Sequence, residues 1–293
     1  MPVKRISFYS EGSRLEGDFY LPDGQGVGER RPAIILCHGY SGTKEVILPD
    51  FARIFAAAGY PTLCFDYRGF GGSGGPKWRI IPHEQIQDIR NAITWIESQP
   101  EVDLQRIGIW GTSNGGALVI SVAAADERVK CVVGQIGFGD GRRLLMDRFT
   151  QEEREEYLTF LRNDRRKRVL TGKGKMGSPG ELLNSDETRQ AAAEALKYMP
   201  AIYCEISYES ADAILEYRPI DVVDKISPRP LMLIAGDKDI LCAPDGYRAA
   251  FDRAGEPKRW ISYPVGHYDM YKPEWVEPSA VAAVEWFKEH LKQ

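Results

Sequence analysis

Ser113 lies between closely spaced glycines in the segment RIGIWGTSNGGA, residues 106–117. Gly111 precedes it by two residues, Gly115 follows it by two residues, and apolar runs flank the segment on both sides. In a turn that passes sharply from a strand into a helix, the residues beside the apex have almost no room for side chains, and glycine meets that demand. The spacing therefore predicts that Ser113 occupies the apex of such a turn, with its hydroxyl exposed for nucleophilic attack.

A serine hydroxyl is a weak nucleophile at neutral pH, so this chemistry requires a base within hydrogen-bond reach and a third group that orients the base. The chain contains four histidines. His290 lies in the last turn of an expected terminal helix, where a solvated ring is the simpler interpretation. His83 follows a proline just before a helical pattern and is interpreted as a helix-entry residue. His267 lies in the loop YPVGHYD after the last expected strand and is favoured as the base.

The orienting acid is expected in the loop after the preceding strand. The sequence LMLIAGDKD offers Asp237 and Asp239 at that place, and both are candidates. Asp269 lies only two residues beyond His267 and is not favoured as its partner. The chain therefore holds a nucleophile, a base and an acid in separate loops that only folding can bring together.

Strand-like and helix-like patterns alternate along most of the chain. Two short alternating segments at 3–9 and 14–21, joined by SEGS, predict a hairpin. Apolar runs typical of buried strands follow at 33–37, 62–65, 107–110, 129–133, 231–234 and 260–263, and helical patterns occur at 48–58, 84–98, 115–125, 246–254 and 279–291. Continuously apolar strands that alternate with helices indicate a mostly parallel, doubly wound α/β sheet covered on both faces, with the antiparallel hairpin at one edge.

Residues 140–218 interrupt this alternation. They are rich in charge and contain no convincing strand pattern, whereas apolar residues recur at helical spacing in several places. Such a stretch is too long for a bare loop, so we predict a helical cap inserted between the core segments 1–139 and 219–293. The basic run at 162–168 follows an acidic block at 152–156 that offsets its charge, which favours a solvated lid helix over a surface for anions or RNA.

Four motifs, HGYSG, GTSNG, AGDKD and GHYD, together resemble the alpha/beta-hydrolase superfamily. In that superfamily the serine, the acid and the histidine follow one another in this chain order, on turns after successive strands. The resemblance spans roughly residues 13–292. It implies an alpha/beta-hydrolase fold in which Ser113, Asp239 and His267 form the catalytic triad, with Asp237 as the alternative acid.

A further segment, DYRGFGGS, is similar to the branch that contains dienelactone hydrolases and Xaa-Pro dipeptidyl-peptidase-like hydrolases. Dienelactone hydrolases often use a cysteine nucleophile where this chain has Ser113. The similarity to that branch is therefore used for the fold context alone.

The resemblance also implies an oxyanion hole. The backbone N–H of Asn114, at the start of a helix, and by resemblance the backbone N–H of Tyr40 are expected to donate hydrogen bonds to the oxyanion. His38, at the end of the first long apolar run, is expected to hold the loop around Tyr40 in shape rather than to transfer protons. Substrate contacts are expected from this loop and from the cap, at His38, Gly39, Tyr40, Tyr203 and Tyr208.

These residues predict a serine hydrolase that cleaves an ester-like bond of a small to mid-sized, partly hydrophobic substrate through an acyl-enzyme. The same triad would also serve an amide, a peptide or a carbon–carbon bond beside a ketone, or acyl transfer to an alcohol other than water. A catalytically silent binding protein of the same fold is the alternative outside enzymes. No metal ion or organic cofactor is implied. The expected partners are a small-molecule substrate and a second copy of the chain, in a homodimer through the cap or the terminal helix.

Composition and charge are ordinary for a soluble globular protein. Of 293 residues, 43% are hydrophobic and 27% are charged, and the net charge of -4 gives no electrostatic reason to expect nucleic acid or an anionic membrane as a partner. Five cysteines, an odd number without a CxxC pair, favour free thiols in a reducing, cytoplasmic setting. No apolar run approaches the roughly 18 residues of a membrane span, and the first residues do not form an apolar signal segment.

Overall fold

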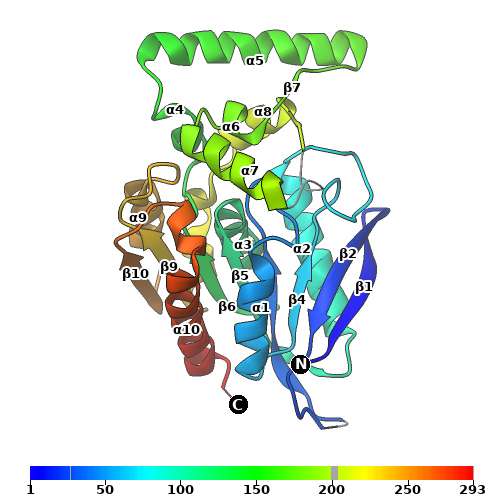
Figure 1. Cartoon of the computed structure of the whole chain (residues 1–293). Coiled ribbons are helices and arrows are strands. Elements are labelled where there is room, and N and C mark those ends of the chain that lie inside the picture. The colour runs from blue at the N-terminus through cyan, green and yellow to red at the C-terminus, as the bar shows by residue number, and fades with distance from the viewer. Residues whose placement is uncertain (27, 199–203, 293) are drawn as a thin grey trace.

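An eight-stranded sheet forms the centre of the computed structural model, which describes residues 1–26, 28–198 and 204–292. The strands lie in the order β1-β2-β4-β3-β5-β6-β9-β10 (Figure 1). Their bounds are β1 (Val3–Ser10), β2 (Ser13–Tyr20), β3 (Arg31–Cys37), β4 (Thr62–Phe65), β5 (Val102–Thr112), β6 (Val129–Gln135), β9 (Leu231–Gly236) and β10 (Lys258–Tyr263). The pairs β1–β2 and β2–β4 are antiparallel and all other pairs in this sheet are parallel. The predicted parallel sheet with an antiparallel hairpin at one edge is therefore confirmed.

Helices cover both faces of the sheet. Two of them, α1 (Leu48–Ala57) and α10 (Pro273–His290), pack on one face, and α2 (Pro82–Glu97), α3 (Asn114–Ala125) and α9 (Pro244–Arg253) pack on the other. Side chains of one strand alternate between the two faces, so in β3 Ile35 joins the core beneath α2 and α3, whereas Ile34 and Leu36 join the core beneath α1 and α10. Burial on both faces explains why the strands read as continuous apolar runs.

The segment 140–218 folds mainly as helices. Its elements are α4 (Gly141–Met146), α5 (Gln151–Thr171), β7 (Met176–Gly177), α6 (Pro179–Leu182), α7 (Asp186–Tyr198), β8 (Ile206–Ser207) and α8 (Glu209–Leu215). The antiparallel pair β7–β8 corrects the expectation that this segment contains no strand. Strands of two residues are too short to produce an alternating pattern, so the sequence carried no signal for them.

Figure 1 shows α4 to α8 gathered at one end of the molecule, with α5 lying across the top and both chain ends at the opposite side. Short 3-10 helices complete the chain: η2 (Pro219–Asp221), η3 (Val223–Ile226) and η4 (Tyr268–Tyr271). In the described part of the chain, no helix combines the length and the apolar character needed to cross a membrane. The five cysteines are all free and buried.

Candidate active site

Ser113 stands at the turn between β5 and α3, as its flanking glycines predict. Its backbone has φ 56° and ψ −122°, a conformation that residues other than glycine rarely adopt. The backbone N–H of Ser113 donates a hydrogen bond to the carbonyl of Gln135 on β6 (2.9 Å), which fixes the turn against the neighbouring strand. Strain of this kind persists only where the surrounding structure holds it, and it is concentrated at functional sites.

The glycines beside Ser113 are required by close backbone approaches. A Cβ atom added at Gly111 would lie 2.3 Å from the carbonyl oxygen of Gly115. A Cβ atom added at Gly115 would lie 2.2 Å from the carbonyl oxygen of Cys37, at the end of β3. The first turn of α3 therefore packs directly on the ends of β3 and β5, and no side chain fits between them.

His267 lies between Ser113 and Asp239 and is hydrogen-bonded to both. Its Nε2 is 3.0 Å from Oγ of Ser113, and its Nδ1 is 2.7 Å from Oδ2 of Asp239. The three residues follow β5, β9 and β10, whose carboxyl ends meet at the same edge of the sheet. The structure thus brings together the three side chains that the sequence motifs selected, and the row is almost completely buried.

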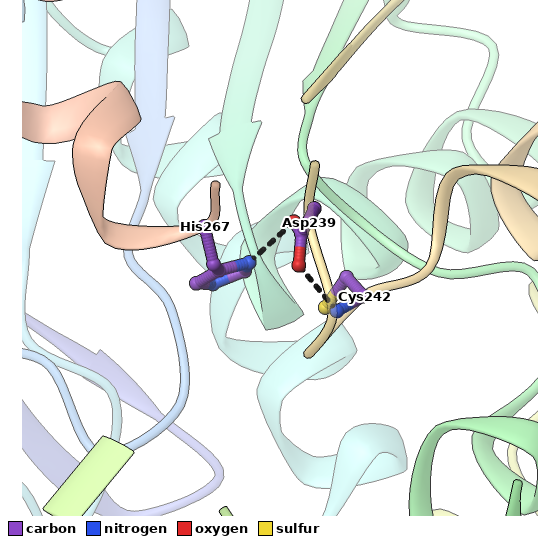
Figure 2. A group of neighbouring side chains, drawn as sticks. All are labelled: Asp239, Cys242 and His267. Atoms are coloured by element: carbon purple, nitrogen blue, oxygen red, sulfur yellow. Dashed lines mark hydrogen bonds and ion pairs between the residues drawn. The ribbon is translucent and has the colours of Figure 1, made fainter. Parts of the chain in front are cut away.

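The carboxylate of Asp239 is held from both sides, as Figure 2 shows. While Oδ2 faces the ring of His267, Oδ1 accepts hydrogen bonds from the backbone N–H groups of Leu241 (2.9 Å) and Cys242 (2.7 Å). Asp237, the alternative acid, has an exposed side chain. The geometry therefore places Asp239 rather than Asp237 against the histidine.

The electrostatics around His267 favour its protonated form. Burial by itself disfavours a charged ring, but the charge of Asp239, the neighbouring Cys242 and the hydrogen bonds of both side chains outweigh it and hold the pKa of His267 well above its ordinary value. A ring that gains a proton from Ser113 would therefore be stabilised by the neighbouring carboxylate.

The expected oxyanion donors lie close to Ser113. Asn114 is the first residue of α3, so its backbone N–H has no acceptor within the helix. A Cβ atom added at Gly39 would lie 3.0 Å from Cβ of Ser113, which places the loop that carries Tyr40 directly beside the serine. The role of the two amides stays a prediction.

His38 is buried beneath this loop. Its Nε2 accepts a hydrogen bond from the backbone N–H of Tyr67 (3.4 Å), which leaves Nδ1 to donate to the carbonyl of Gly39 (2.9 Å). Burial lowers the pKa of His38, so the neutral ring is favoured. These contacts fit the structural role predicted for His38.

A cavity of about 370 Å³ opens onto Ser113 and His267. Its wall combines the loop after β3, which includes His38, Gly39 and Tyr40, with residues of α6, α7 and η4. Tyr208 is not part of the wall, contrary to the expected substrate contact. Tyr208 instead packs edge-on against Phe160 of α5, with ring centroids 4.8 Å apart, and so belongs to the packing of the cap. Tyr203 lies outside the described residues.

The comparisons with known proteins identify the family. A model of the family described as "Serine aminopeptidase, S33" matches residues 28–270. The chain belongs to this family of alpha/beta hydrolases.

Individual relatives of this hydrolase cover nearly its whole length. An Escherichia coli protein described as "Uncharacterized 31.7 kDa protein in traX-finO intergenic region" is 37% identical over 96% of this chain and 97% of its own. "Polyketide transferase grgF" of Penicillium is 29% identical over 90% of each chain, and its crystal structure superimposes with a TM-score of 0.84 and 26% identity over 99% of both chains. "Thiohydrolase aneE" of Aspergillus aculeatus is 26% identical over 86% of this chain and 82% of its own.

Several residues of the hydrolase cavity were not identified from the sequence. Tyr271 hydrogen-bonds Thr112 through its hydroxyl (2.9 Å), and Tyr268 bonds Thr188 of α7 in the same way (3.0 Å). Both tyrosines line the cavity. Their position just after His267 was the available signal, because residues next to a candidate base tend to line the same cavity.

A cysteine adjoins the acid and the histidine. One donor atom from each of Asp239, Cys242 and His267 lies within 4.8 Å of the others, a set that includes the ligand types of zinc (Figure 2). The acid and the base of this set already make hydrogen bonds. Nδ1 of His267 faces Asp239, and Oδ1 of Asp239 accepts hydrogen bonds from two backbone N–H groups. A cation here would have to replace the hydrogen bond between His267 and Asp239.

Proposed function

We propose that this alpha/beta hydrolase is a serine hydrolase that cleaves an ester-like bond of a partly hydrophobic acyl substrate. The observation that carries the proposal is the buried row in which His267 lies 3.0 Å from Oγ of Ser113 and 2.7 Å from Asp239. A base between a nucleophile and an orienting acid is the arrangement that activates a serine hydroxyl.

The reaction proceeds in two halves. His267 accepts the proton of Ser113 as Oγ attacks the carbonyl carbon, and the oxyanion accepts hydrogen bonds from the N–H groups of Tyr40 and Asn114. His267 then gives the proton to the leaving oxygen, the bond to the leaving group breaks, and an acyl-enzyme remains. Water, deprotonated by His267, attacks the acyl carbon and releases the acid with recovery of Ser113.

The composition of the cavity wall favours a neutral acyl group over a peptide with a free amino terminus. Binding a terminal ammonium requires an acceptor such as a carboxylate, and binding an acidic substrate requires a cation. Among the described residues, the wall contains no Asp, Glu, Lys or Arg. This supports an ester-like substrate more than the aminopeptidase reaction in the family description.

Acyl transfer is the second candidate, favoured by the name of one relative, the polyketide transferase of Penicillium. The other relative named above, a thiohydrolase, is described as a hydrolase. Hydrolysis and transfer share the same acyl-enzyme and differ in the acceptor that attacks it. Product analysis with an added alcohol separates them, because transfer gives a new ester whereas hydrolysis gives the free acid.

Labelling with a fluorophosphonate and turnover of p-nitrophenyl esters test the proposal together. Ser113→Ala should lose the label and lower kcat by a factor of about 10⁴ or more, since the acyl-enzyme cannot form. Ser262→Ala, at an exposed serine on β10, is the matched control and should behave as the wild type. Persistence of labelling and turnover in Ser113→Ala would refute the assignment.

A further inference from the structure

One face of α7 forms part of the cavity wall. The residues that line the cavity recur at intervals of three, four and eight, which places them on a single helical face: Thr188, Ala191, Ala192 and Leu196. Ala193, the residue directly after Ala192, is exposed and does not line the cavity. Figure 1 shows α7 at the end of the sheet where the cap helices gather.

Most of the remaining wall is apolar, and Ser41, Thr43 and Ser178 add hydroxyl groups to it. The segment before and into α1 contributes Val46, Ile47 and Leu48, and the α6–α7 connection contributes Leu183. With the charged side chains absent from the described wall, the groups available to a ligand beyond the reacting carbonyl are mainly hydrocarbon. A neutral apolar chain loses the least hydration free energy on entering such a space and gains the most from the burial of its apolar surface.

The middle of the α7 wall is made of small side chains. Ala191 and Ala192 each present one methyl group, whereas Leu196 and Leu183 present larger side chains. Larger residues at these two positions would project into the space that the alanines leave open. At roughly 30 Å³ for each non-hydrogen atom, the molecular volume of liquid water, a cavity of about 370 Å³ holds roughly a dozen such atoms.

We propose that this hydrolase acts on neutral, medium-length acyl chains of about eight to ten carbons, and that Ala191 and Ala192 of α7 determine the longest chain it accepts. The inference rests on the proposed function, because it assumes that the acyl group enters this cavity from Ser113.

The first test compares p-nitrophenyl esters from acetate to palmitate. In the wild type, kcat/KM should rise about fourfold for each added methylene until the cavity is filled, and then fall. Ala192→Phe should move the maximum to shorter chains and lower the octanoate-to-acetate ratio of kcat/KM by about 16-fold or more, equivalent to two lost methylenes. Ala192→Leu, a smaller change that perturbs folding less, should shift the maximum in the same direction by fewer carbons.

Ala193→Phe is the matched control, since it adds the same ring one residue away on the exposed face of the same helix. Its chain-length profile should equal that of the wild type. The proposal is overturned if Ala192→Phe leaves the profile unchanged while its fold is intact by circular dichroism, if Ala193→Phe shifts it equally, or if the wild type prefers alanine p-nitroanilide or an acidic acyl group over octanoate.

A binding measurement separates this inference from the proposed function. In Ser113→Ala, which cannot turn over, isothermal titration with the neutral ketone 2-decanone should give a Kd at least tenfold lower than with 2-butanone, and Ala192→Phe should remove that preference. If no ester is hydrolysed but this preference is found and removed as stated, the proposed function fails and the binding inference stands. If esters are hydrolysed but the ketones bind equally, the inference alone fails.

Discussion

Asp239 has no freedom to turn away from His267. One carboxylate oxygen faces the ring, and the other accepts hydrogen bonds from the backbone N–H groups of Leu241 and Cys242. The backbone of the loop after β9 therefore orients the carboxylate independently of the histidine. Asp237 lies on the same loop with its side chain exposed. The same loop therefore contains both a candidate acid and a natural control for it.

Replacing each aspartate in turn tests the choice between them. Asp239→Asn should lower kcat by about 10⁴-fold, because an amide no longer stabilises the protonated ring and can favour the wrong tautomer. Asp237→Asn should keep kcat within a factor of about three of the wild type, as is usual for an exposed side chain away from the chemistry. Steady-state kinetics with p-nitrophenyl butyrate measures both, and a larger loss in Asp237→Asn would transfer the assignment to Asp237.

The pH dependence of kcat/KM should show the influence of Asp239 on the ring. His267 must be neutral to accept the serine proton, and its pKa is raised well above 6.5, so activity should fall as pH decreases through a midpoint above 6.5. Asp239→Asn removes the negative charge that raises this pKa, so the midpoint of its remaining activity should move to lower pH. A wild-type midpoint at or below 6.5, unchanged in the variant, would contradict this account of the pKa.

The success of sequence reasoning differed between residues for physical reasons. Ser113, Asp239 and His267 were selected because strand ends, turn glycines and chain order restrict where such residues can stand, and their catalytic roles stay proposals. Tyr208 was expected as a substrate contact, whereas the structure places it in the packing of the cap. Nothing in its local sequence specifies which way a cap helix faces. The sequence showed the cavity face of α7 only as helical spacing, because the side chains of its two alanines have no functional group that would mark a binding site.

At the scale of elements, the junction of β5 and α3 depends on glycine at a helix position where other helices accept larger residues. Gly115 and Gly246 both lie in the first turn of a helix, α3 and α9. A Cβ atom would lie 2.2 Å from the Cys37 carbonyl oxygen at Gly115, but its nearest neighbour at Gly246 would be 3.5 Å away, on the end of the Arg143 side chain. The two glycines therefore have opposite tolerance for the same substitution.

Gly115→Ala should destabilise the fold by about 1–3 kcal/mol through overpacking and disturb the Ser113 turn, with a loss of kcat. Gly246→Ala should be neutral or stabilise by up to about 1 kcal/mol, because alanine restricts the unfolded chain and favours helix. Thermal unfolding followed by circular dichroism gives the order of the two melting temperatures. Equal tolerance of both substitutions would mean that the close approach at Gly115 relaxes without cost.

The elements themselves were predicted to the extent that burial imposes a pattern on them. Strands β3, β6 and β9 are mostly buried on both faces, and their apolar runs marked their ends within two residues. In β5 only the buried second half carried such a run, so the strand begins five residues earlier than expected, at Val102. The pair β7–β8 has two residues in each strand and was missed. The structure also ties α7 to the loop that carries His267 through the hydrogen bond between Thr188 and Tyr268, a contact between distant segments that no local pattern encodes.

At the scale of the whole molecule, the cap helices and the sheet share one hydrophobic core. The cluster that contains Ile35 and Ile109 of the sheet continues without a break through Leu161 of α5 and Ile214 of α8. Polar contacts cross the same boundary, including the ion pair between Arg79 and Glu209 (2.8 Å) and the bonds from Ile80 N–H to Ser210 Oγ (2.9 Å) and from Arg148 to the Leu241 carbonyl (3.0 Å). The cap is thus an insertion in sequence, and its treatment as a separate domain stays a proposal, as does the predicted homodimer.

A continuous core predicts that the cap and the sheet unfold together. Cys204 lies in the inserted segment and Cys131 in β6, both buried, so their thiols report on the two parts of one molecule. Pulsed alkylation at increasing urea, read by mass spectrometry, should give the same unfolding midpoint for both thiols. Unfolding of the cap alone would expose the apolar surface of the core that the cap covers. Ser113→Ala, with the same core, is the control that excludes an effect of turnover. Labelling of Cys204 at clearly lower urea than Cys131 would show instead that the cap opens as a unit of its own. The shape of the cavity beside Ser113 would then depend on that opening as well as on Ala191 and Ala192.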